Sequence, residues 1–578
     1  MGVITSMVDL LRMRSWIDGD RTAYTFLDDG EQDGTSFNWM DVDVRSRAIG
    51  AAVARQMDAG GRVLIMLPPG VEFASAFFGV LYGGAVAIPT YPPSGSLTDR
   101  TRTRIRSMLA DAGVSLVVSC GALHARVAAI EALVPELSGI PWLDIDNVDL
   151  DDASTWKAPR AGGSTLALLQ YTSGSTANPR GVMVSHGNLL HNLAHAADLG
   201  RYNRDSVSVS WLPVNHDMGL INGVLQGVHS GSRTIQMSPA AFLQRPSRWL
   251  QAISRFGASH SGGPNFAYDL CARRVSDEDR DSLDLRTWEL AYNGSEPVRR
   301  STLETFMRAF GSCGFRWTSL RPGYGLAEAT LLVTSDEAET APVFHPASRK
   351  GVPLVSAASQ GGDWVGCGVV DGTMQIRIVD PVTLVPREHG DVGEIWVAGA
   401  SVAAGYWNKP RESAATFRAV IAGTSDAPYL RTGDLGCVID GHLFVTGRIK
   451  DVLIVRGLKH YPHEIEATAE AAHGSLRPGC CVVFSIQREG EESIAVIAEV
   501  ESRFGSALAG EIGTDAISAI RRAVANGHQV ALHAVALVPA GTLPKTTSGK
   551  LQRFLCRDGF VDGTLSPLAA WCASERVA

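Results

Sequence analysis

QYTSGSTANPRGVMVSHGNL, residues 170–189, joins an apolar run to an amphipathic one through a loop of small and hydroxyl-bearing residues. The residues of this loop that suit an anion are Thr172, Ser173, Gly174, Ser175, Thr176 and Arg180. Small residues let successive backbone N–H groups turn toward one anion, hydroxyl groups donate further hydrogen bonds, and the arginine adds positive charge. The Gly-Lys-Ser/Thr ending of a Walker A loop is absent. The stretch therefore predicts a phosphate site of another class, although a flexible surface turn has the same composition.

Apolar runs that suit β-strands alternate with helical stretches on both sides of this loop. The runs cover 63–67, 114–118, 165–171 and 207–212, and a helical stretch covers 189–199. Such alternation is typical of parallel βαβ units, so we expect an α/β fold. Residues 374–404 change character, because Val/Ile-rich strands are separated by turn residues, and they predict a small β-rich subdomain.

The last part of the chain predicts a separate, compact α+β domain. A helix is expected at 462–472, with strands at 480–486 and 493–500. We therefore expect a large N-terminal domain over 1–449, made of two α/β subdomains and the β-rich subdomain. A smaller C-terminal domain over 450–578 would follow it.

Composition narrows the classes of function. The chain has 578 residues, 45% of them hydrophobic, and a formal net charge of −8, so it is long enough for several buried cores. No basic block occurs, which argues against nucleic acid and against stable membrane association. Nine cysteines form no CxxC pair, and no secretory signal opens the sequence. We expect reduced thiols, a cytoplasmic location and small soluble substrates.

Further motifs suit a nucleotide site. His216 follows the strand-like run 207–212, where a loop at the carboxyl edge of a sheet would place it beside a ligand. Tyr324 and Glu328 offer an aromatic face for a purine and a carboxylate for Mg²⁺ on one glycine-containing turn. Asp434 follows a tight Thr-Gly turn and suits a ribose diol. Taken singly, each also fits a structural histidine or an ordinary loop.

Three basic residues lie in the last third of the chain within short motifs. Arg448 and Lys450 belong to the string GRIKD, at the expected domain boundary, where Arg448 could reach a ribose or phosphate and Lys450 could act as a hinge. Lys550 ends the string LPKTTSGK on a loop near the C-terminus. Solvated charged turns are the alternative interpretation for both strings.

These motifs, in this order, resemble the adenylate-forming superfamily of acyl-CoA synthetases, peptide-synthetase adenylation domains and luciferases, over about residues 22–557. The resemblance implies that the 172–181 loop binds the phosphates of ATP and that Glu328 holds Mg²⁺. It implies that adenine is held by Asn293, Gly294, Ser295, Glu296, Pro297, Tyr324 and Gly325. Asp434 and Arg448 would contact the ribose, and Lys550 would be the catalytic lysine, with His216 beside it in the site. The domain over 450–578 would be a mobile lid, with Lys450 marking its hinge.

Within the superfamily the sequence is most similar to fatty acyl-AMP ligases. Strings such as HDMGLI at 216–221 and NGSEP at 293–297 carry this likeness. The gap after Glu328 resembles the insertion of these ligases, here about 335–363, which is associated with a carrier protein as acceptor. Ala177 and Arg180 depart from the usual glycine and lysine of the phosphate loop, and Ala327 is typical of these ligases.

The resemblance implies ATP-dependent activation of a fatty acid to an acyl-adenylate with release of pyrophosphate. The acyl group would then pass to the phosphopantetheine thiol of a separate acyl carrier protein, by a bacterial enzyme of polyketide or lipopeptide biosynthesis that is a monomer or dimer. An acyl-CoA synthetase that uses free CoA is the nearest alternative. An amino-acid adenylation domain and a non-catalytic nucleotide-binding protein are the others.

Overall fold

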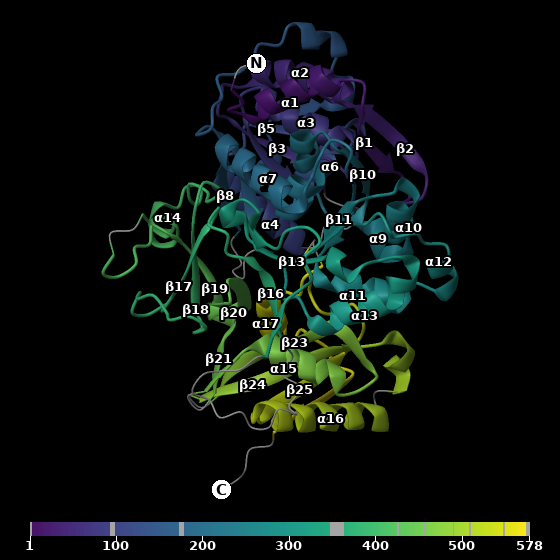
Figure 1. Cartoon of the computed structure of the whole chain (residues 1–578), viewed down its shortest axis with the longest axis vertical. Coiled ribbons are helices and arrows are strands. Elements are labelled where there is room, and N and C mark those ends of the chain that lie inside the picture. Colours follow the sequence, from purple (N-terminus) through teal and green to yellow (C-terminus); the bar gives the residue numbers. More distant parts are fainter. Residues whose placement is uncertain are drawn as a thin grey trace.

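A computed structural model describes residues 3–92, 99–172, 179–346, 363–424, 427–455, 458–488, 491–507, 510–546 and 549–573. Its strands form four sheets of four or more strands and one short hairpin. Figure 1 shows the chain running from α1 and α2 at one end of the molecule to α16 at the other, with the strands β17–β20 on one flank. The expected alternation of strands and helices is confirmed, and so is the α/β class.

The predicted phosphate loop joins the last two strands of a six-stranded sheet. In spatial order the strands are β6 (Trp142–Asp144), β5 (Leu116–Ser119), β3 (Arg62–Met66), β4 (Val86–Thr90), β7 (Leu166–Thr172) and β8 (Arg180–Ser185). All neighbouring pairs are parallel except β7 and β8, which are antiparallel and set Thr172 opposite Arg180. The strands are almost wholly apolar because the central strands of a parallel sheet are buried on both faces.

Helices and short 3-10 turns connect and flank the strands of this sheet. They are α1 (Met7–Asp18), α2 (Trp39–Gln56), α3 (Glu72–Tyr82), α4 (Asp99–Ala112), α5 (Gly121–His124), α6 (Val127–Leu133) and α7 (His186–Gly200), with 3-10 turns η1 (Pro135–Leu137), η2 (Ile145–Asn147) and η3 (Leu150–Ser154). Helix α7 begins directly after β8 because Ser185 caps it. The Ser185 hydroxyl accepts a hydrogen bond from the Asn188 amide at 3.1 Å, and the Asn188 side-chain oxygen accepts one from the Ser185 amide at 2.9 Å.

An eight-stranded sheet forms the second α/β unit. Its spatial order is β14 (Leu332–Ser335), β13 (Leu320–Gly325), β12 (Leu290–Asn293), β11 (His260–Gly263), β9 (Val207–Ser210), β10 (Arg233–Met237), β1 (Thr22–Leu27) and β2 (Asp33–Asn38). The pairs from β1 to β13 are parallel, whereas both edge pairs are antiparallel. The carboxyl ends of β9, β11, β12 and β13 therefore meet at one edge, where ligands bind in open α/β sheets.

The helical elements of this second unit include one unusual segment. They are η4 (Met218–Leu225), α8 (Gln226–Ser230), α9 (Pro239–Gln244), α10 (Ser247–Phe256), α11 (Asn265–Arg274), α12 (Asp277–Asp281), α13 (Arg300–Phe310), η5 (Gly311–Cys313), η6 (Trp317–Ser319) and η7 (Ala327–Ala329). The segment η4 is a π-helix, a form that concentrates at functional sites. It begins two residues after His216.

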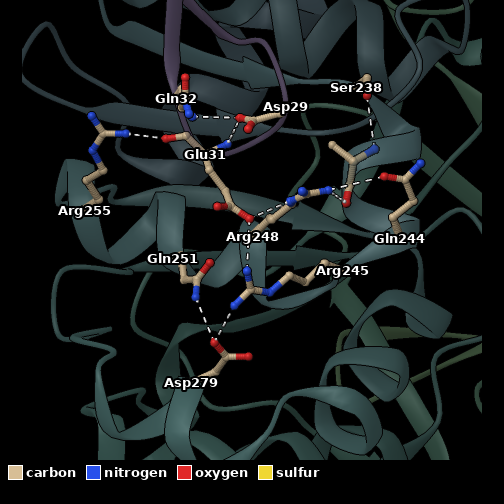
Figure 2. Close-up of polar contacts among 11 residues, drawn as sticks. Asp29, Glu31, Gln32, Ser238, Gln244, Arg245, Arg248, Gln251, Arg255 and Asp279 are labelled. Carbon is tan, nitrogen blue, oxygen red and sulfur yellow. Dashed lines mark hydrogen bonds and ion pairs between the residues drawn. The ribbon is translucent and has the colours of Figure 1, made fainter.

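A surface cluster of charges fastens the β1–β2 turn to α9, α10 and α12 (Figure 2). Glu31 accepts hydrogen bonds from Arg248 Nε at 2.9 Å and from Arg245 Nη1 at 3.1 Å, and Arg245 also contacts Asp279 at 3.0 Å. Each of these guanidinium groups has an acidic partner, so the cluster offers no excess positive charge. It holds a hairpin in place and contains no predicted site residue.

The β-rich subdomain is larger than the sequence predicted. An antiparallel six-stranded sheet has the order β15 (Phe344–His345), β16 (Trp364–Val369), β20 (His442–Arg448), β19 (Leu430–Ile439), β18 (Gly393–Ala398) and β17 (Gln375–Val379), beside α14 (Pro410–Phe417). Strands beyond 374–404 complete it. Thr432, Gly433 and Asp434 lie inside β19, with Gly433 at φ +72°, whereas a tight turn had been expected.

The C-terminal elements form a third core, as expected for an α+β unit. They are η8 (Ile449–Asp451), β21 (Leu453–Val455), β22 (Leu458–His460), α15 (Pro462–Ala471), β23 (Leu476–Arg488), β24 (Glu491–Val500), η9 (Ser502–Ala507), α16 (Glu511–His528), β25 (Leu532–Val538), α17 (Arg553–Val561) and β26 (Ala569–Cys572). Strands β23, β24, β25 and β26 pair in that order, and α15 and α16 pack on them through an apolar core. No helix among the residues described is long and apolar enough to cross a bilayer.

Candidate active site

Three residues predicted to bind the nucleoside form one hydrogen-bonded chain. The Tyr324 hydroxyl donates to Asp434 Oδ2 at 2.8 Å, and Arg448 Nε donates to Asp434 Oδ1 at 2.8 Å. Tyr324 and Asp434 are buried, whereas the side chain of Arg448 is 60% exposed. The neighbouring Asp434 carboxylate raises the pKa of Arg448. The arrangement fixes an aromatic ring, a carboxylate and an outward-facing guanidinium next to one another.

The register of β19 and β20 explains this proximity. Asp434 and Arg448 are cross-strand partners in the antiparallel pair, so the two motifs, 14 residues apart, lie side by side. Tyr324 reaches them from β13, in the neighbouring unit. The three residues therefore tie the eight-stranded sheet to the β-rich sheet.

Glu328 lies in η7, just beyond the carboxyl end of β13, and is held by a residue that the sequence did not single out. The Tyr406 hydroxyl donates to Glu328 Oε1 at 2.8 Å. Burial raises the pKa of the Glu328 carboxyl, while the Tyr406 hydrogen bond and the charge of Arg448 act in the opposite direction. No motif of the sequence marks Tyr406, because it comes from an irregular segment between β18 and α14.

Tyr406 also connects Glu328 to Arg180. The guanidinium of Arg180 lies 5.0 Å from the centre of the Tyr406 ring, within cation–π range, and its Nε is 3.1 Å from Glu412 Oε2. Tyr406 thus links Arg180, the cation predicted in the phosphate loop, to Glu328, the predicted Mg²⁺ ligand. Ser173, Gly174, Ser175, Thr176 and Ala177 lie outside the described residues, as does the side chain of Thr172.

Lys550 reaches this region from the C-terminal part of the chain. Burial lowers the pKa of its ammonium group; Asp217, Glu296 and Asp434 act to raise it, and Arg448 acts to lower it. Its loop is anchored by the Thr546 amide, which donates to the Lys550 carbonyl at 2.7 Å. Gly549 has φ +87°, and a Cβ there would lie 2.8 Å from the Phe266 ring, so the loop is seated against α11.

Among the carboxylates, Asp217 has the largest electrostatic effect on the pKa of Lys550. It lies next to the predicted His216. His216 Nδ1 and Asp217 Oδ1 are 2.6 Å apart, and the Met218 amide donates to the same oxygen at 2.7 Å. Burial acts to raise the pKa of Asp217, but the charge and hydrogen bond of His216, together with Lys550, bring it below its usual range. Asp217 is therefore ionised, and its charge favours the protonated form of Lys550. His216 stabilises the ionised form of Asp217.

The segment predicted to hold adenine follows β12 and packs closely on β13. Asn293 is 1% exposed, and its Oδ1 has no hydrogen-bond partner within the described part of the chain. A Cβ on Gly294 would lie 2.9 Å from the Gly323 carbonyl oxygen, and Ser295 adopts φ +73°. Glu296 turns back to accept a hydrogen bond from the Phe266 amide at 2.7 Å. The following Pro297 is exposed.

Lys450, the predicted hinge, lies in η8 and is exposed. Its neighbour Asp451 forms an ion pair of 2.8 Å with Arg553, at the start of α17. Gly325 lies at the end of β13, where a Cβ would approach the Leu331 carbonyl to 1.9 Å, so only glycine fits there.

A cavity of about 100 Å³ opens beside this cluster. Asp217, Gly294, Ser295, Tyr324 and Gly325 line the end next to the predicted nucleotide residues. Most of the remaining wall is apolar and includes Ala196, Leu199, Met218, Leu290, Leu331 and Leu332. Small-molecule sites have this character, because an apolar wall binds the body of a ligand and a few polar groups orient it.

The donor set fits a single magnesium ion held jointly with phosphates. Among the residues that the structure describes, no three His, Cys, Asp or Glu side chains gather as a metal cage. Mg²⁺ commonly takes one or two protein carboxylates and completes its shell with water and substrate phosphates. The single Glu328 carboxylate, near Arg448, suits this mode of binding.

Comparison with known proteins agrees with this geometry. Residues 16–407 match the AMP-binding enzyme family, and residues 450–569 match the family described as Disco-interacting protein 2-like, AMP domain. The medium-chain-fatty-acid–[acyl-carrier-protein] ligase JamA of Moorena producens is 42% identical over 97% of this chain and 96% of its own. The long-chain-fatty-acid–AMP ligase FadD23 of Mycobacterium tuberculosis is 36% identical over 96% of each chain.

A solved structure supports the same assignment. The fatty acyl-adenylate ligase of Legionella pneumophila, in complex with acyl adenylate and pyrophosphate, is 36% identical and covers 98% of each chain with a TM-score of 0.74. The resemblance drawn from the motifs is confirmed, and so is the fold expected from it. The chain belongs to the fatty acyl-AMP ligases, AMP-forming enzymes of the adenylate-forming superfamily.

Proposed function

We propose that this enzyme joins a fatty acid to AMP and then transfers the acyl group to the phosphopantetheine thiol of a separate acyl carrier protein. The observation that carries the proposal is the approach of Lys550, from the C-terminal part of the chain, to the Tyr324–Asp434–Arg448 cluster at the mouth of an apolar cavity. The names of JamA and FadD23 agree with it.

In the first step, a carboxylate oxygen of the fatty acid attacks the α-phosphorus of ATP. A new P–O bond forms, the bond to the bridging oxygen breaks, and pyrophosphate leaves; no proton is transferred. The enzyme contributes by positioning the reactants and by offsetting their charge. Asp434 and Arg448 would hold the ribose, and Arg180 would contact the phosphates. Lys550 would contact the oxygens between the acyl and phosphoryl groups. Adenine would lie against Tyr324 and the Asn293–Pro297 segment.

Glu328 would hold Mg²⁺ in this step. When bound, the ion offsets charge on the triphosphate oxygens. Tyr406 orients the Glu328 carboxylate through its hydrogen bond. Because burial raises the pKa of Glu328, a cation at this carboxylate would favour its ionised form.

In the second step, the thiol sulfur attacks the acyl carbonyl. A C–S bond forms, the C–O bond to AMP breaks, and the thiol proton is lost to solvent. We infer that a domain over 450–578 swings away from the domain over 1–449 about Lys450, withdrawing Lys550 and opening a path for the thiol. The exposed position of Lys450 in η8 supports this inference.

The test compares acceptors. The enzyme is incubated with ATP, Mg²⁺, a fatty acid and either CoA or a phosphopantetheinylated carrier protein, and thioesters are measured by mass spectrometry. We expect acyl-adenylate in both mixtures and thioester mainly with the carrier protein. Rapid formation of acyl-CoA would favour the acyl-CoA synthetase alternative. We expect the reaction to take place in the cytoplasm.

A further inference from the structure

Two buried charged residues, Arg321 and Asp336, line the far end of the cavity, where a plain hydrocarbon chain would offer them no polar partner. Strand β13 runs along it from Leu320 to Gly325, and Arg321 lies four residues before Gly325, roughly 13 Å from the nucleotide end. The antiparallel strand β14 sets Ser335 opposite Gly323, so Asp336 continues toward Arg321. Both Arg321 and Asp336 line the cavity.

Asp336 is a buried carboxyl group whose nearest partner, the His442 imidazole, lies at the limit of hydrogen-bond distance. Its side chain is 1% exposed, and neither Oδ1 nor Oδ2 has a hydrogen-bond partner among the residues described. His442 Nε2 lies 3.5 Å from Oδ1, and the Val369 amide faces the group outside hydrogen-bond geometry. Burial raises the pKa of Asp336, and His442 and Arg321 counteract this only in part.

Arg321 is the complementary case, a buried guanidinium with one donor left unpaired. Its Nη1 donates to the Thr340 carbonyl at 2.7 Å and its Nη2 to the Thr318 carbonyl at 2.9 Å, but Nε has no partner in the described part of the chain. Burial lowers the pKa of Arg321 to about 10, which leaves the group cationic at neutral pH. Buried polar groups are normally hydrogen-bonded, so an unpaired donor and an unpaired acceptor at one cavity end call for a ligand.

Asn293 Oδ1 is also unpaired among the described residues, but it lies at the nucleotide end, and the polar pair Tyr202 and Asn222 on the same wall is already satisfied. The Tyr202 hydroxyl donates to Asn222 Oδ1 at 3.2 Å. A terminal methyl group would leave Arg321 and Asp336 unsatisfied, which is costly because each keeps its desolvation penalty. A hydroxyl group can donate and accept at once. An amine would be repelled by Arg321, and a carboxylate by Asp336.

We propose that the pocket selects fatty acids with a hydroxyl group at or near the far end of the chain, donating to Asp336 and accepting from Arg321. This rests on the proposed function, because it assigns the cavity to the acyl chain. Sites built to hydrogen-bond a substrate hydroxyl discriminate far more strongly than apolar pockets do. The selectivity of this enzyme would then reside in a few atoms at the cavity end.

The test uses matched pairs of fatty acids, each with and without a terminal hydroxyl group, from short to long chains. Acyl-adenylate formation is followed by pyrophosphate release. We expect kcat/KM of the best hydroxylated acid to exceed that of its plain partner by about tenfold or more. Asp336→Leu should abolish or reverse this ratio, and Asp336→Asn should reduce it. Glu339→Gln, which removes an exposed carboxylate near Arg321 outside the cavity wall, should leave the ratio unchanged.

The outcomes separate the two proposals. If the wild-type enzyme adenylates plain acids as well as hydroxylated ones at every length, a water molecule or nothing fills the cavity end and the inference is wrong. An unchanged ratio in both Asp336 variants also contradicts it. If no acid of either kind is adenylated, the proposed function itself fails. Should Asp336→Leu not fold, Asp336→Asn and the wild-type ratio still decide.

Discussion

At the scale of single residues, Lys550 carries the proposed first step. The charges of Asp217, Glu296 and Asp434 favour the protonated form of its ammonium group, whereas burial acts against it. Lys550→Ala should lower pyrophosphate exchange about 100- to 1,000-fold, the cost of removing one preorganised transition-state donor. ATP binding, followed by calorimetry, should change little.

Lys545 provides a matched control for this substitution. It lies in the same loop, but its ammonium contacts Cys480 Sγ at 3.2 Å, and it is not among the groups that act on the pKa of Asp217. Lys545→Ala should retain most of the exchange activity. Equal losses in the two variants would show that the loop as a whole, and not the Lys550 charge, supports the reaction.

The pH dependence of the first step follows from the same group. Lys550 must be protonated to offset phosphate charge, so activity is present below its pKa and is lost as pH rises through it. Burial lowers this pKa, so the alkaline loss of kcat/KM should begin below the usual range of a lysine. In Lys550→Arg the remaining activity should lack this loss, because a guanidinium stays protonated. A wild-type profile that is flat into the range of ordinary lysines would contradict the assignment.

Tyr406 tests whether Glu328 needs orientation. A hydrogen bond to a charged acceptor contributes about 1.5–3 kcal/mol, so Tyr406→Phe should lower kcat/KM for adenylation about tenfold or more and raise the Mg²⁺ concentration needed for half-maximal rate. The measurement is pyrophosphate exchange titrated with Mg²⁺. Tyr429→Phe is the control, because Tyr429 is equally buried in the β-rich unit and contacts only Gln375, at 3.4 Å, through its hydroxyl. Identical Mg²⁺ curves for wild type and Tyr406→Phe would refute this role.

Among the secondary-structure elements, the short turn η8 is the place where a substitution should affect acyl transfer without affecting adenylation. Arg448, before it, is extended at φ −122° and ψ 142°, the conformation favoured before proline, and Ile449 begins the turn. A proline at the first position of a helical turn fits without strain and fixes φ. Ile449→Pro should therefore preserve this conformation and stiffen the backbone at residues 448 and 449, immediately before Lys450.

We expect Ile449→Pro to retain acyl-adenylate formation and to lose most acyl transfer to the carrier protein. Both rates can be measured in one sample by mass spectrometry. Lys450→Ala, which removes the charge but not the backbone freedom, should retain both. Transfer at the wild-type rate in Ile449→Pro would argue against a hinge at this turn.

Regular elements could be predicted where hydrophobic periodicity is local. Strands β3, β5, β7 and β9, helix α7 and helix α15 lie within a few residues of the expected ranges. The extent of the β-rich sheet was underestimated because some of its paired strands are distant in sequence. Strands β16 and β20, for example, pair across more than 70 residues. The Thr432–Asp434 motif was expected in a turn because glycine favours one, but its positive φ is accommodated inside β19.

Site residues could be predicted where a motif marked them, and not where only the fold brings them together. Tyr324, Glu328, Asp434, Arg448 and Lys550 were predicted and lie together, although their roles stay predictions. The Tyr406–Glu328 hydrogen bond and the electrostatic effect of Asp217 on Lys550 depend on segments that are far apart in sequence. The same holds for Arg321 and Asp336, which become neighbours only through the pairing of β13 with β14.

In the molecule as a whole, three bodies of structure meet at one place. The eight-stranded sheet supplies Tyr324, the β-rich sheet supplies Asp434 and Arg448, and the C-terminal part supplies Lys550. The seating of Gly549 against Phe266 fits the first half-reaction, in which Lys550 is needed. The central claim is that these groups act on an acyl-adenylate.

That claim is tested most directly by following the carboxylate oxygen of the substrate. A fatty acid labelled with heavy oxygen in its carboxyl group is incubated with ATP, Mg²⁺ and a carrier protein, and the products are analysed by mass spectrometry. The account predicts labelled AMP, unlabelled pyrophosphate and an acyl thioester, because the attacking oxygen stays on the α-phosphorus. ADP with labelled phosphate, or unlabelled AMP, would contradict it.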